Sequence, residues 1–167
     1  MQKIQIGIVG VGAISSIYLE NITNVFQEIE IRGVCDLVPE RALQAKEKYG
    51  ISVYPDMQAM FADPAIDIIL NLTRPYEHFD VSMAALKAGK HVYSEKPLGA
   101  SLEEGRTLMA EAKARNLLLL HYPVMLKGNC ASGCIQLMLH HNQSEQFRLP
   151  ELLQSDFYEQ QIGRAHV

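Results

Sequence analysis

A glycine-rich turn near the amino terminus holds the first residues whose types and spacing could do chemistry. Gly10 and Gly12 are followed by Ala13, Ile14 and Ser15, in the spacing Gly-x-Gly-x-x-Ser. In dinucleotide-binding folds the first glycine permits a tight turn, the second lets the backbone approach a pyrophosphate, and a small third residue lets a helix pack on the sheet. Backbone N–H groups at the start of that helix would hold phosphate charge. Taken alone, the pattern also fits a strand-to-helix turn that binds nothing.

Asp36 is an acidic side chain at the expected end of the second strand, where such folds hold the adenosine ribose. A carboxylate there accepts a hydrogen bond from the ribose 2′-OH and repels a 2′-phosphate, which favours NAD over NADP. The simpler alternative is a loop acid that caps the helix after Pro39. Arg41 follows closely and offers a partner for a 2′-phosphate, so NADP stays open as the less favoured cofactor.

Strand and helix patterns alternate along residues 1–121, as is needed to place these groups at the ends of strands. Apolar runs and period-two alternation predict six strands, near residues 4–8, 30–35, 51–54, 66–72, 91–94 and 117–120. Helical spacing and capping residues predict helices between them, at 14–25, 39–49, 56–62, 75–88 and 101–115. This order predicts an α/β fold, a doubly wound parallel sheet of the Rossmann type with right-handed crossovers.

Two sequence runs add a family resemblance. The chain reads NLTRPYEH at 71–78 and AGKHVYSEKPL at 88–98. Together with the glycine turn and Asp36, these runs resemble the Gfo/Idh/MocA family of nicotinamide-dependent oxidoreductases, over about residues 3 to 120. The resemblance implies a Rossmann domain followed by a larger α/β substrate domain. It also implies hydride transfer between NAD(P) and a carbinol of a sugar, inositol or related polyol.

The resemblance implies specific roles for residues of this chain. Cofactor contacts are expected at Gly10, Gly12, Ala13, Ile14 and Asp36, and after the fourth strand at Thr73, Pro75 and His78. Glu95 is expected to line the nicotinamide ribose site. Lys96 is expected to contact the cofactor site and to lie beside the carbinol oxygen as the catalytic residue, where a cation stabilises developing negative charge and relays the hydroxyl proton.

Each of these residues also has a simpler interpretation. Lys96 would be a surface lysine after a strand, and Glu95 would only pair with it. His78 would be a solvated histidine in the first turn of a helix. Thr73 and Pro75 would only shape the turn into that helix.

The composition is typical of about one soluble globular domain. The 167 residues are 48% hydrophobic and 20% charged, with a formal net charge of −4 and a sequence pI of about 5.8. This balance excludes binding of nucleic acid or an anionic membrane by charge alone. No apolar run is long enough to span a membrane. Three cysteines without a framework spacing indicate reduced thiols, and we expect a cytoplasmic protein.

The regular pattern fades after residue 121. We expect 1–121 to form the dinucleotide-binding domain and 122–167 to be an irregular tail, with the substrate domain absent. The last six residues read IGRAHV, which is one frame of a common sequencing adapter, so the tail is interpreted as divergent, frame-shifted or artefactual. Cys130, Cys134 and His140 are too loosely spaced for a zinc site, and no metal is expected.

Three functions remain open at this point, of which the third is a structural or regulatory remnant that binds nothing. The intact gene product is expected to be a dehydrogenase that binds a dinucleotide and a small sugar or polyol. The alternative is a catalytically inactive dinucleotide-binding fragment, which is what we expect of this chain. A domain face left bare by a missing partner would favour association between copies, so a homo-oligomer is compatible with the sequence.

Overall fold

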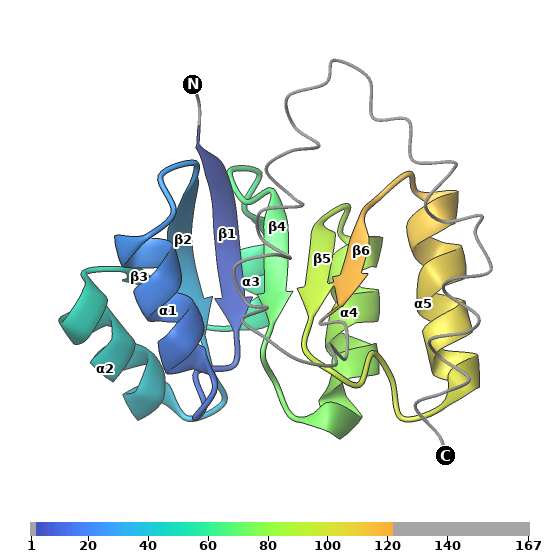
Figure 1. Cartoon of the computed structure of the whole chain (residues 1–167), viewed down its shortest axis with the longest axis horizontal. Helices are drawn as coiled ribbons and strands as arrows, with labels where there is room; N and C mark the ends of the chain where they lie inside the picture. The colour runs from blue at the N-terminus through green and yellow to red at the C-terminus, as the bar shows by residue number, and fades with distance from the viewer. Residues whose placement is uncertain (1–2, 122–167) are drawn as a thin grey trace. The chain divides into compact units, whose positions relative to one another are not determined.

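A single parallel sheet organises the computed structural model of the chain, which describes residues 3–121. The strands are β1 (Ile4–Val9), β2 (Ile29–Cys35), β3 (Ser52–Val53), β4 (Ile68–Asn71), β5 (His91–Ser94) and β6 (Leu119–His121). Their order across the sheet is β3-β2-β1-β4-β5-β6, and every pair is parallel (Figure 1). The chain starts in the middle, moves outward on one side, and returns to build the other side. The predicted doubly wound Rossmann fold is therefore confirmed.

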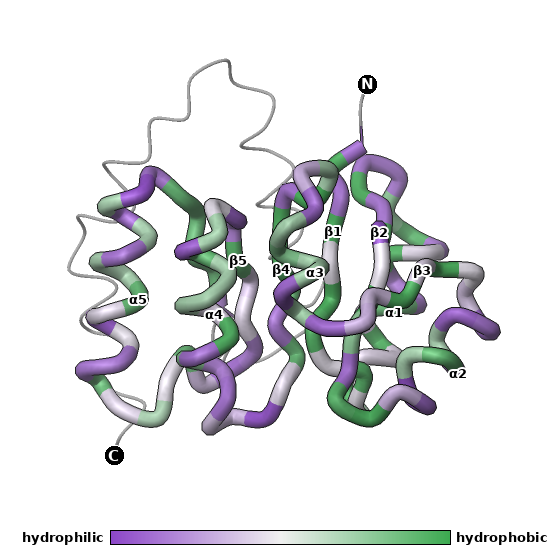
Figure 2. Tube along the Cα trace, turned by 180° about the vertical axis from the view of Figure 1, so that it is seen from behind, coloured by the Kyte–Doolittle hydropathy of each residue, from purple (hydrophilic) through white to green (hydrophobic). Residues whose placement is uncertain are grey.

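Helices connect the strands and cover the sheet. They are α1 (Ser15–Asn24), α2 (Pro39–Tyr49), α3 (Met57–Ala62), α4 (His78–Lys87) and α5 (Leu102–Ala114), with a 3₁₀ turn, η1 (Pro75–Glu77), before α4. Helices α1 and α2 lie on one face, and α3 and α4 lie on the other, where α5 packs beside α4 (Figures 1 and 2). None of the helices in this part of the chain combines the length and apolarity needed to cross a membrane.

The core lies along the middle strands, which are covered on both faces and therefore read as apolar runs rather than as alternating patterns. Ile8, Ile69 and Val92, from three neighbouring strands, are fully buried. Cys35 belongs to this core as a free thiol. Its burial, and secondarily the carboxylates of Asp36 and Asp56, raise the pKa of the Cys35 thiol to about 12. The thiol is therefore protonated and unreactive at neutral pH.

Three predicted helix boundaries are confirmed by caps at Gly50, Asp56 and Ser101. Gly50 ends α2 with a left-handed φ of 69°, and the Asp56 side chain accepts the N–H of Ala59 at 2.7 Å at the start of α3. At the start of α5, Ser101 Oγ accepts the N–H of Glu104 at 3.1 Å. Glu104 does not complete a reciprocal capping box with Ser101, because its carboxylate accepts the N–H of Ala100 and not that of Ser101.

Several element boundaries differ from the sequence prediction, and β4, predicted over 66–72, covers only Ile68–Asn71. The helix predicted from Pro75 begins with the 3₁₀ turn η1, and α-helical geometry starts only at His78. The last strand begins at Leu119 and not at Leu117, because the N–H of Leu117 bonds back to the carbonyl of Ala112 at 2.9 Å and so belongs to the end of α5. At a helix end of this kind, the first residues of an apolar run bond to the helix and are therefore not part of the following strand.

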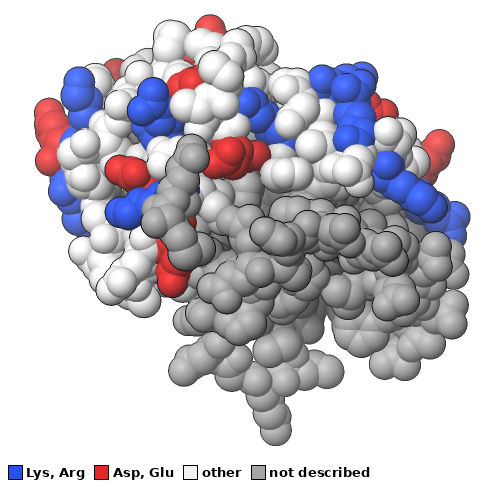
Figure 3. Space-filling model, turned by 90° about the horizontal axis from the view of Figure 1, so that it is seen from above, with Lys and Arg blue, Asp and Glu red and all other residues white. Residues whose placement is uncertain are grey.

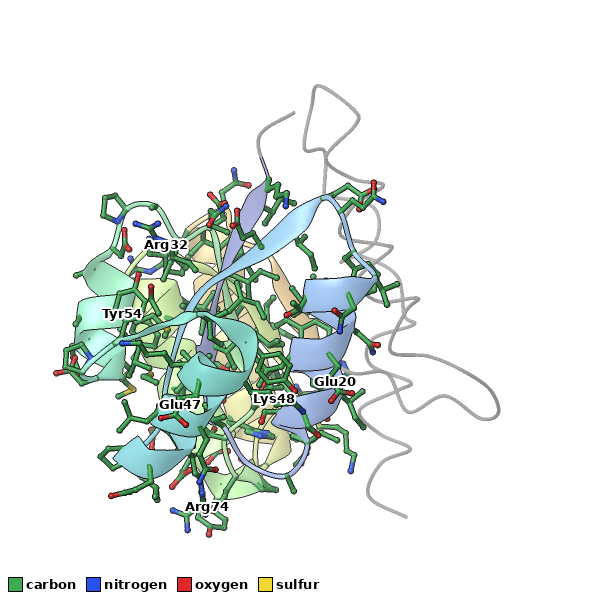
Figure 4. All side chains as sticks on the ribbon, turned by 90° about the vertical axis from the view of Figure 1, so that its left-hand side faces the viewer. Glu20, Arg32, Glu47, Lys48, Tyr54 and Arg74 are labelled. Atoms are coloured by element: carbon green, nitrogen blue, oxygen red, sulfur yellow. The ribbon has the colours of Figure 1, made fainter. Side chains whose placement is uncertain are left out.

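Charged side chains of both signs are intermixed on the surface. Figure 3 shows lysines and arginines lying among aspartates and glutamates over the described part of one face. One exposed pair joins two helices, with Lys48 Nζ of α2 lying 3.0 Å from Glu20 Oε1 of α1 (Figure 4). Exposed ion pairs of this kind contribute little to stability, about 0–1 kcal/mol.

The ring of His91, at the start of β5, forms a hydrogen bond with the connection between α5 and β6. Nδ1 of His91 accepts the N–H of Leu118 at 3.0 Å, which only a neutral ring nitrogen can do. Burial lowers the pKa of His91 from its ordinary value of 6.5, with the Asp67 carboxylate opposing this change. Because the pKa is lower in the folded state, the contribution of His91 to stability is present above pH 6.5 and is lost as the pH falls below it.

We expect His91→Asn to remove this pH dependence, because an asparagine Oδ1 accepts the same N–H without titrating. Between pH 7 and pH 5 the wild-type chain should lose more free energy of unfolding than the variant does. The difference should be about the 0.5–1.5 kcal/mol that one hydrogen bond contributes. Urea unfolding at several pH values measures it, and parallel pH curves for the two proteins would show that the ring does not titrate with folding.

Candidate cofactor site

The carboxyl ends of four strands meet at one edge of the sheet, the lower edge in Figure 1. In the strand register Val9 pairs with Cys35 on one side and with Asn71 on the other, and Asn71 pairs with Ser94. These four residues form one row across the sheet. The residues that directly follow the row therefore stand side by side at this edge: Gly10, Asp36, Leu72 and Glu95. The strand order reverses between β1 and β4, which is where doubly wound sheets bind their ligands.

The glycine turn leaves β1 pressed against the end of β4. Gly10 has a φ of +93°, and a Cβ at this position would lie 2.8 Å from the backbone C and O of Leu72. Ser15 is buried at the start of α1, and its Oγ donates to the carbonyl of Gly12 at 2.7 Å. Ala13 and Ile14 are exposed at the same helix start. A small residue at position 15 therefore lets α1 approach the sheet, as the glycine pattern predicts.

The Asp36 carboxylate fixes the glycine turn from the neighbouring strand. Its Oδ2 accepts the N–H of Val11 at 2.6 Å, and its Oδ1 accepts the N–H of Val38 at 2.8 Å. Arg41 approaches to 3.8 Å, and the Asp36 side chain is only 7% exposed. The alternative interpretation of Asp36, as a loop acid near the start of α2, thus accounts for its contact with Val38 alone. The other contact joins Asp36 to the turn where a pyrophosphate would lie.

Asn71 is a buried polar residue at the end of β4 that organises the following turn. Its Nδ2 donates to the carbonyl of His78 at 3.0 Å and to Ser82 Oγ at 2.9 Å. Its Oδ1 accepts the hydroxyl of Thr73 at 2.6 Å and the Thr73 N–H at 3.3 Å. We did not single out Asn71 as a functional residue. The signal that could have found it is its polarity inside an otherwise apolar strand.

His78 lies in the interior, with 1% of its surface exposed. Nδ1 lies 2.6 Å from the carbonyl oxygen of Pro97, and Nε2 lies 3.0 Å from that of Thr73. Both ring nitrogens thus face protein oxygens, so the alternative interpretation of His78 as a solvated histidine is wrong. This arrangement also leaves no ring nitrogen for the predicted direct contact with a cofactor. The contacts support a different role, in which His78 joins the turn after β4 to the loop after β5.

Glu95 and Lys96 begin the loop after β5. The N–H of Glu95 donates to the carbonyl of Asn71 at 3.0 Å, which continues the sheet register by one residue. Glu95 Oε2 accepts the backbone N–H of Lys96 at 3.1 Å. Among the ion pairs of residues 3–121, none joins the Glu95 carboxylate to the Lys96 ammonium group. Lys96 is an exposed residue that directly follows Glu95 in the sequence.

Tyr18, on α1, reaches the same loop from the side of the glycine turn. Its hydroxyl donates to Glu95 Oε1, and its ring contacts Tyr93 edge to face with the centroids 6.2 Å apart. Burial, the hydrogen bond to Glu95 and the proximity of Tyr93 all raise the pKa of Tyr18. The sequence motifs did not identify Tyr18 as a functional residue. A hydroxyl on an apolar helix face is the signal that could have found it.

Comparison with known proteins identifies the domain. Residues 4–122 match the Gfo/Idh/MocA proteins, described as an oxidoreductase family with an NAD-binding Rossmann fold. The chain belongs to the Gfo/Idh/MocA oxidoreductase family. It carries the NAD-binding Rossmann domain of that family, as the sequence runs at 71–78 and 88–98 predicted.

The relatives include inositol dehydrogenases. The chain is 33% identical over 102 residues to an inositol 2-dehydrogenase/D-chiro-inositol 3-dehydrogenase of Lactiplantibacillus plantarum, a match that covers 60% of this chain and 29% of that protein. It is 32% identical over 123 residues to an NADP(+)-linked scyllo-inositol 2-dehydrogenase of Bacillus subtilis, covering 73% of this chain and 34% of that protein.

A solved structure shares the fold and contains a cofactor. The WlbA dehydrogenase of Bordetella pertussis, in complex with NADH and UDP-GlcNAcA, superposes with a TM-score of 0.68 at 27% identity, covering 72% of this chain and 35% of that chain. The matched part of our chain thus spans about a third of the length of the relatives it resembles.

Some expectations from the sequence lie outside the described residues. These concern the tail at 122–167, its adapter-like end and the disfavoured zinc ligands Cys130, Cys134 and His140. Within residues 3–121, no group of three or more His, Cys, Asp or Glu side chains is arranged to hold a metal ion.

We expect Gly10→Ala and Gly12→Ala to differ sharply in stability. The first places a Cβ against the Leu72 backbone in a left-handed conformation and should lower the free energy of unfolding by about 2 kcal/mol or more. The second has no described atom within 4 Å of the new Cβ, so it should change stability by less than about 1 kcal/mol. Urea unfolding of both variants measures this, and equal losses would contradict the close approach at Gly10.

Proposed function

We propose that this chain is the cofactor-binding part of an NAD-dependent dehydrogenase that oxidises or reduces a carbinol of an inositol, sugar or related polyol. The observation that carries the proposal is the row of strand ends, which brings Gly10, Asp36 and the Glu95–Lys96 pair to one edge of the sheet. The family and its inositol dehydrogenase members support the reaction class.

The residues at this edge fit a dinucleotide. A Cβ on Gly12 would meet no described atom within 4 Å, so there is open space beside the turn where a pyrophosphate would approach. The exposed helix start at Ala13 and Ile14 would face the phosphates, with the positive end of the α1 dipole behind them. Asp36, already fixed by two backbone N–H groups, would accept the adenosine ribose hydroxyls.

Thr73, Pro75 and Glu95 would border the nicotinamide side of this site. Thr73 is held by Asn71, Pro75 opens η1, and Glu95 is anchored to β4 through its N–H. The nicotinamide cofactor supplies the redox chemistry, as a carrier of hydride. The protein's part is to place a carbinol carbon at the right position and to manage the proton on its oxygen.

Lys96 is the residue we assign to that proton. Lys96 is exposed and directly follows Glu95, and the hydrogen bond from its backbone N–H to Glu95 Oε2 fixes where the side chain starts. An ammonium group beside the carbinol oxygen stabilises the negative charge that develops when the hydroxyl proton leaves. To pass that proton on, the lysine first releases one of its own protons to solvent, and its neutral amine then accepts the hydroxyl proton.

Binding without turnover is the second candidate function. It is favoured by the extent of the matches, which cover about a third of each relative, while the family match is to an NAD-binding Rossmann fold. Calorimetry with NADH and an assay of NAD reduction with myo-inositol, both on the 167-residue chain, separate the two candidates. Binding with turnover supports the dehydrogenase, binding alone supports the second candidate, and no binding contradicts both.

We expect Asp36→Ala to weaken binding of NAD by about tenfold or more, because a charge-assisted hydrogen bond to the ribose is lost. Binding of NADP should weaken less or improve, because the repulsion of a 2′-phosphate disappears and Arg41, 3.8 Å from Asp36, becomes its partner. Asp36→Asn is the matched control, since it keeps an amide oxygen and removes only the charge. Titration calorimetry with both cofactors measures the ratio, and unchanged affinities for both would remove this assignment of Asp36.

We expect Lys96→Met to separate binding from chemistry. The variant keeps most of the aliphatic stem and loses the charge, so NADH affinity should stay within about threefold of the wild type. The rate of NAD reduction with an inositol should fall by about a hundredfold or more, the usual contribution of a positioned acid–base group. Lys87→Met, on the last turn of α4, is the control for a surface lysine. A Lys96→Met rate equal to that of the control would show that Lys96 is not catalytic.

A further inference from the structure

Tyr18 combines the burial of a core residue with a hydrogen bond that packing alone does not need. It lies on the sheet-facing side of α1 with only 4% of its surface exposed, as core residues do. Yet its hydroxyl donates a hydrogen bond to the carboxylate of Glu95, which lies in the loop after β5 and not on α1. The two partners are 77 residues apart in the sequence, so only the tertiary fold brings them together.

Each oxygen of the Glu95 carboxylate accepts a hydrogen bond from a different donor. Oε1 accepts the Tyr18 hydroxyl, and Oε2 accepts the backbone N–H of Lys96. The main chain of Glu95 is itself anchored to β4 through the carbonyl of Asn71. A carboxylate held at both oxygens in this way has one orientation, and it transmits that orientation to the next residue of the loop.

The Tyr18 hydroxyl, which is the donor to Glu95, stays protonated. Burial raises the pKa of Tyr18, and the neighbouring Glu95 and Tyr93 raise it further, so the phenol keeps its proton throughout the physiological range. The ring is also fixed, since it contacts Tyr93 edge to face. A protonated hydroxyl on a fixed ring is suited to orienting a carboxylate.

We propose that Tyr18 is a positioning residue for the nicotinamide side of the site, where it orients Glu95 and, through Glu95, the backbone of Lys96. The part of this proposal that concerns the nicotinamide rests on the proposed function. Tyr18 acts from α1, whose first turn would face the pyrophosphate. The same helix therefore ties the centre of the cofactor site to the loop that carries the catalytic lysine.

Tyr18→Phe removes the hydroxyl and keeps the ring, so it separates positioning from packing. A matched control exists in Tyr54, whose hydroxyl donates to the Asp63 carboxylate in another part of the domain, near Arg32 (Figure 4). Tyr54→Phe removes the same kind of bond without touching the site. Unfolding in urea should show losses of similar size for the two variants.

The first measurement needs no cofactor. With ¹⁵N-lysine labelling of the 167-residue chain, the Lys96 amide reports its hydrogen bond to Glu95 through its chemical shift and its rate of exchange with water. In Tyr18→Phe we expect the Lys96 signal to move and its exchange to accelerate by about threefold or more. In Tyr54→Phe it should stay in place. A Lys96 amide that is the same in Tyr18→Phe and in the wild type would overturn the proposal.

The second measurement divides the cofactor into halves. Calorimetry with NADH reports the whole ligand, and calorimetry with ADP reports the adenosine half alone. Tyr18→Phe should weaken NADH binding by about fivefold, equivalent to one hydrogen bond, and leave ADP binding unchanged. Equal NADH affinity in wild type and variant, or an equal loss for NADH and ADP, would overturn the positioning role. A wild-type chain that binds neither ligand would contradict the proposed function, while the Lys96 amide would still decide whether Tyr18 orients the loop.

Discussion

The parallel pairing of β1 with β4 is the constraint on which the rest of the site depends. It sets Val9 opposite Asn71, and the N–H of Leu72 then donates to the carbonyl of Val9 at 2.9 Å. The two chains stay so close beyond the strands that a Cβ on Gly10 would collide with the Leu72 backbone. The close contact between the chain after β1 and the Leu72 backbone therefore requires a glycine at position 10, whether or not a ligand binds. The turn that results is also the one that a pyrophosphate could approach.

Hydrogen bonds between buried polar groups make the turns after β4 and β5 into one unit. Asn71 and His78 are almost completely buried, yet in the described part of the chain no buried side-chain nitrogen or oxygen lacks a partner. An unpaired buried group costs about 1–3 kcal/mol, so each partner is kept in place by the other. His78 contacts the carbonyls of Thr73 and Pro97, and Asn71 contacts Thr73 and the backbone of Glu95. A displacement of one turn is therefore transmitted to the other.

Periodicity and capping residues were enough to predict most of the fold. The helix at 39–49 illustrates this, since Pro39 starts it and Gly50 ends it with a left-handed φ. The prediction was less accurate where a residue's partner is distant in the sequence. An apolar run shows that a segment is buried, but it does not show that Leu117 bonds back to α5 and so shortens β6.

The candidate site shows the same division between residue type and residue partner. The motif identified Asp36, Glu95 and Lys96, and the register places Asp36 and Glu95 at one edge of the sheet. It did not identify Tyr18 or Asn71, because their roles depend on which atoms the sheet register brings near their polar groups. His78 was assigned to the cofactor from its place in the motif, and its burial between two carbonyl oxygens was not visible in the residue type.

The two carboxylates of the site are fixed in the same way, and α1 connects them. Asp36 and Glu95 each accept one backbone N–H from the turn that they stabilise, Val11 in one case and Lys96 in the other. Charges that are oriented before a ligand arrives need no reorganisation when it binds. Helix α1 begins where the glycine turn ends, and Tyr18 follows one turn later, about 5 Å along the helix axis. A ligand with two halves joined by a pyrophosphate needs its two ends held at a constant separation. A rigid helix that would begin beside the pyrophosphate, and that bonds through Tyr18 to Glu95, would provide that separation.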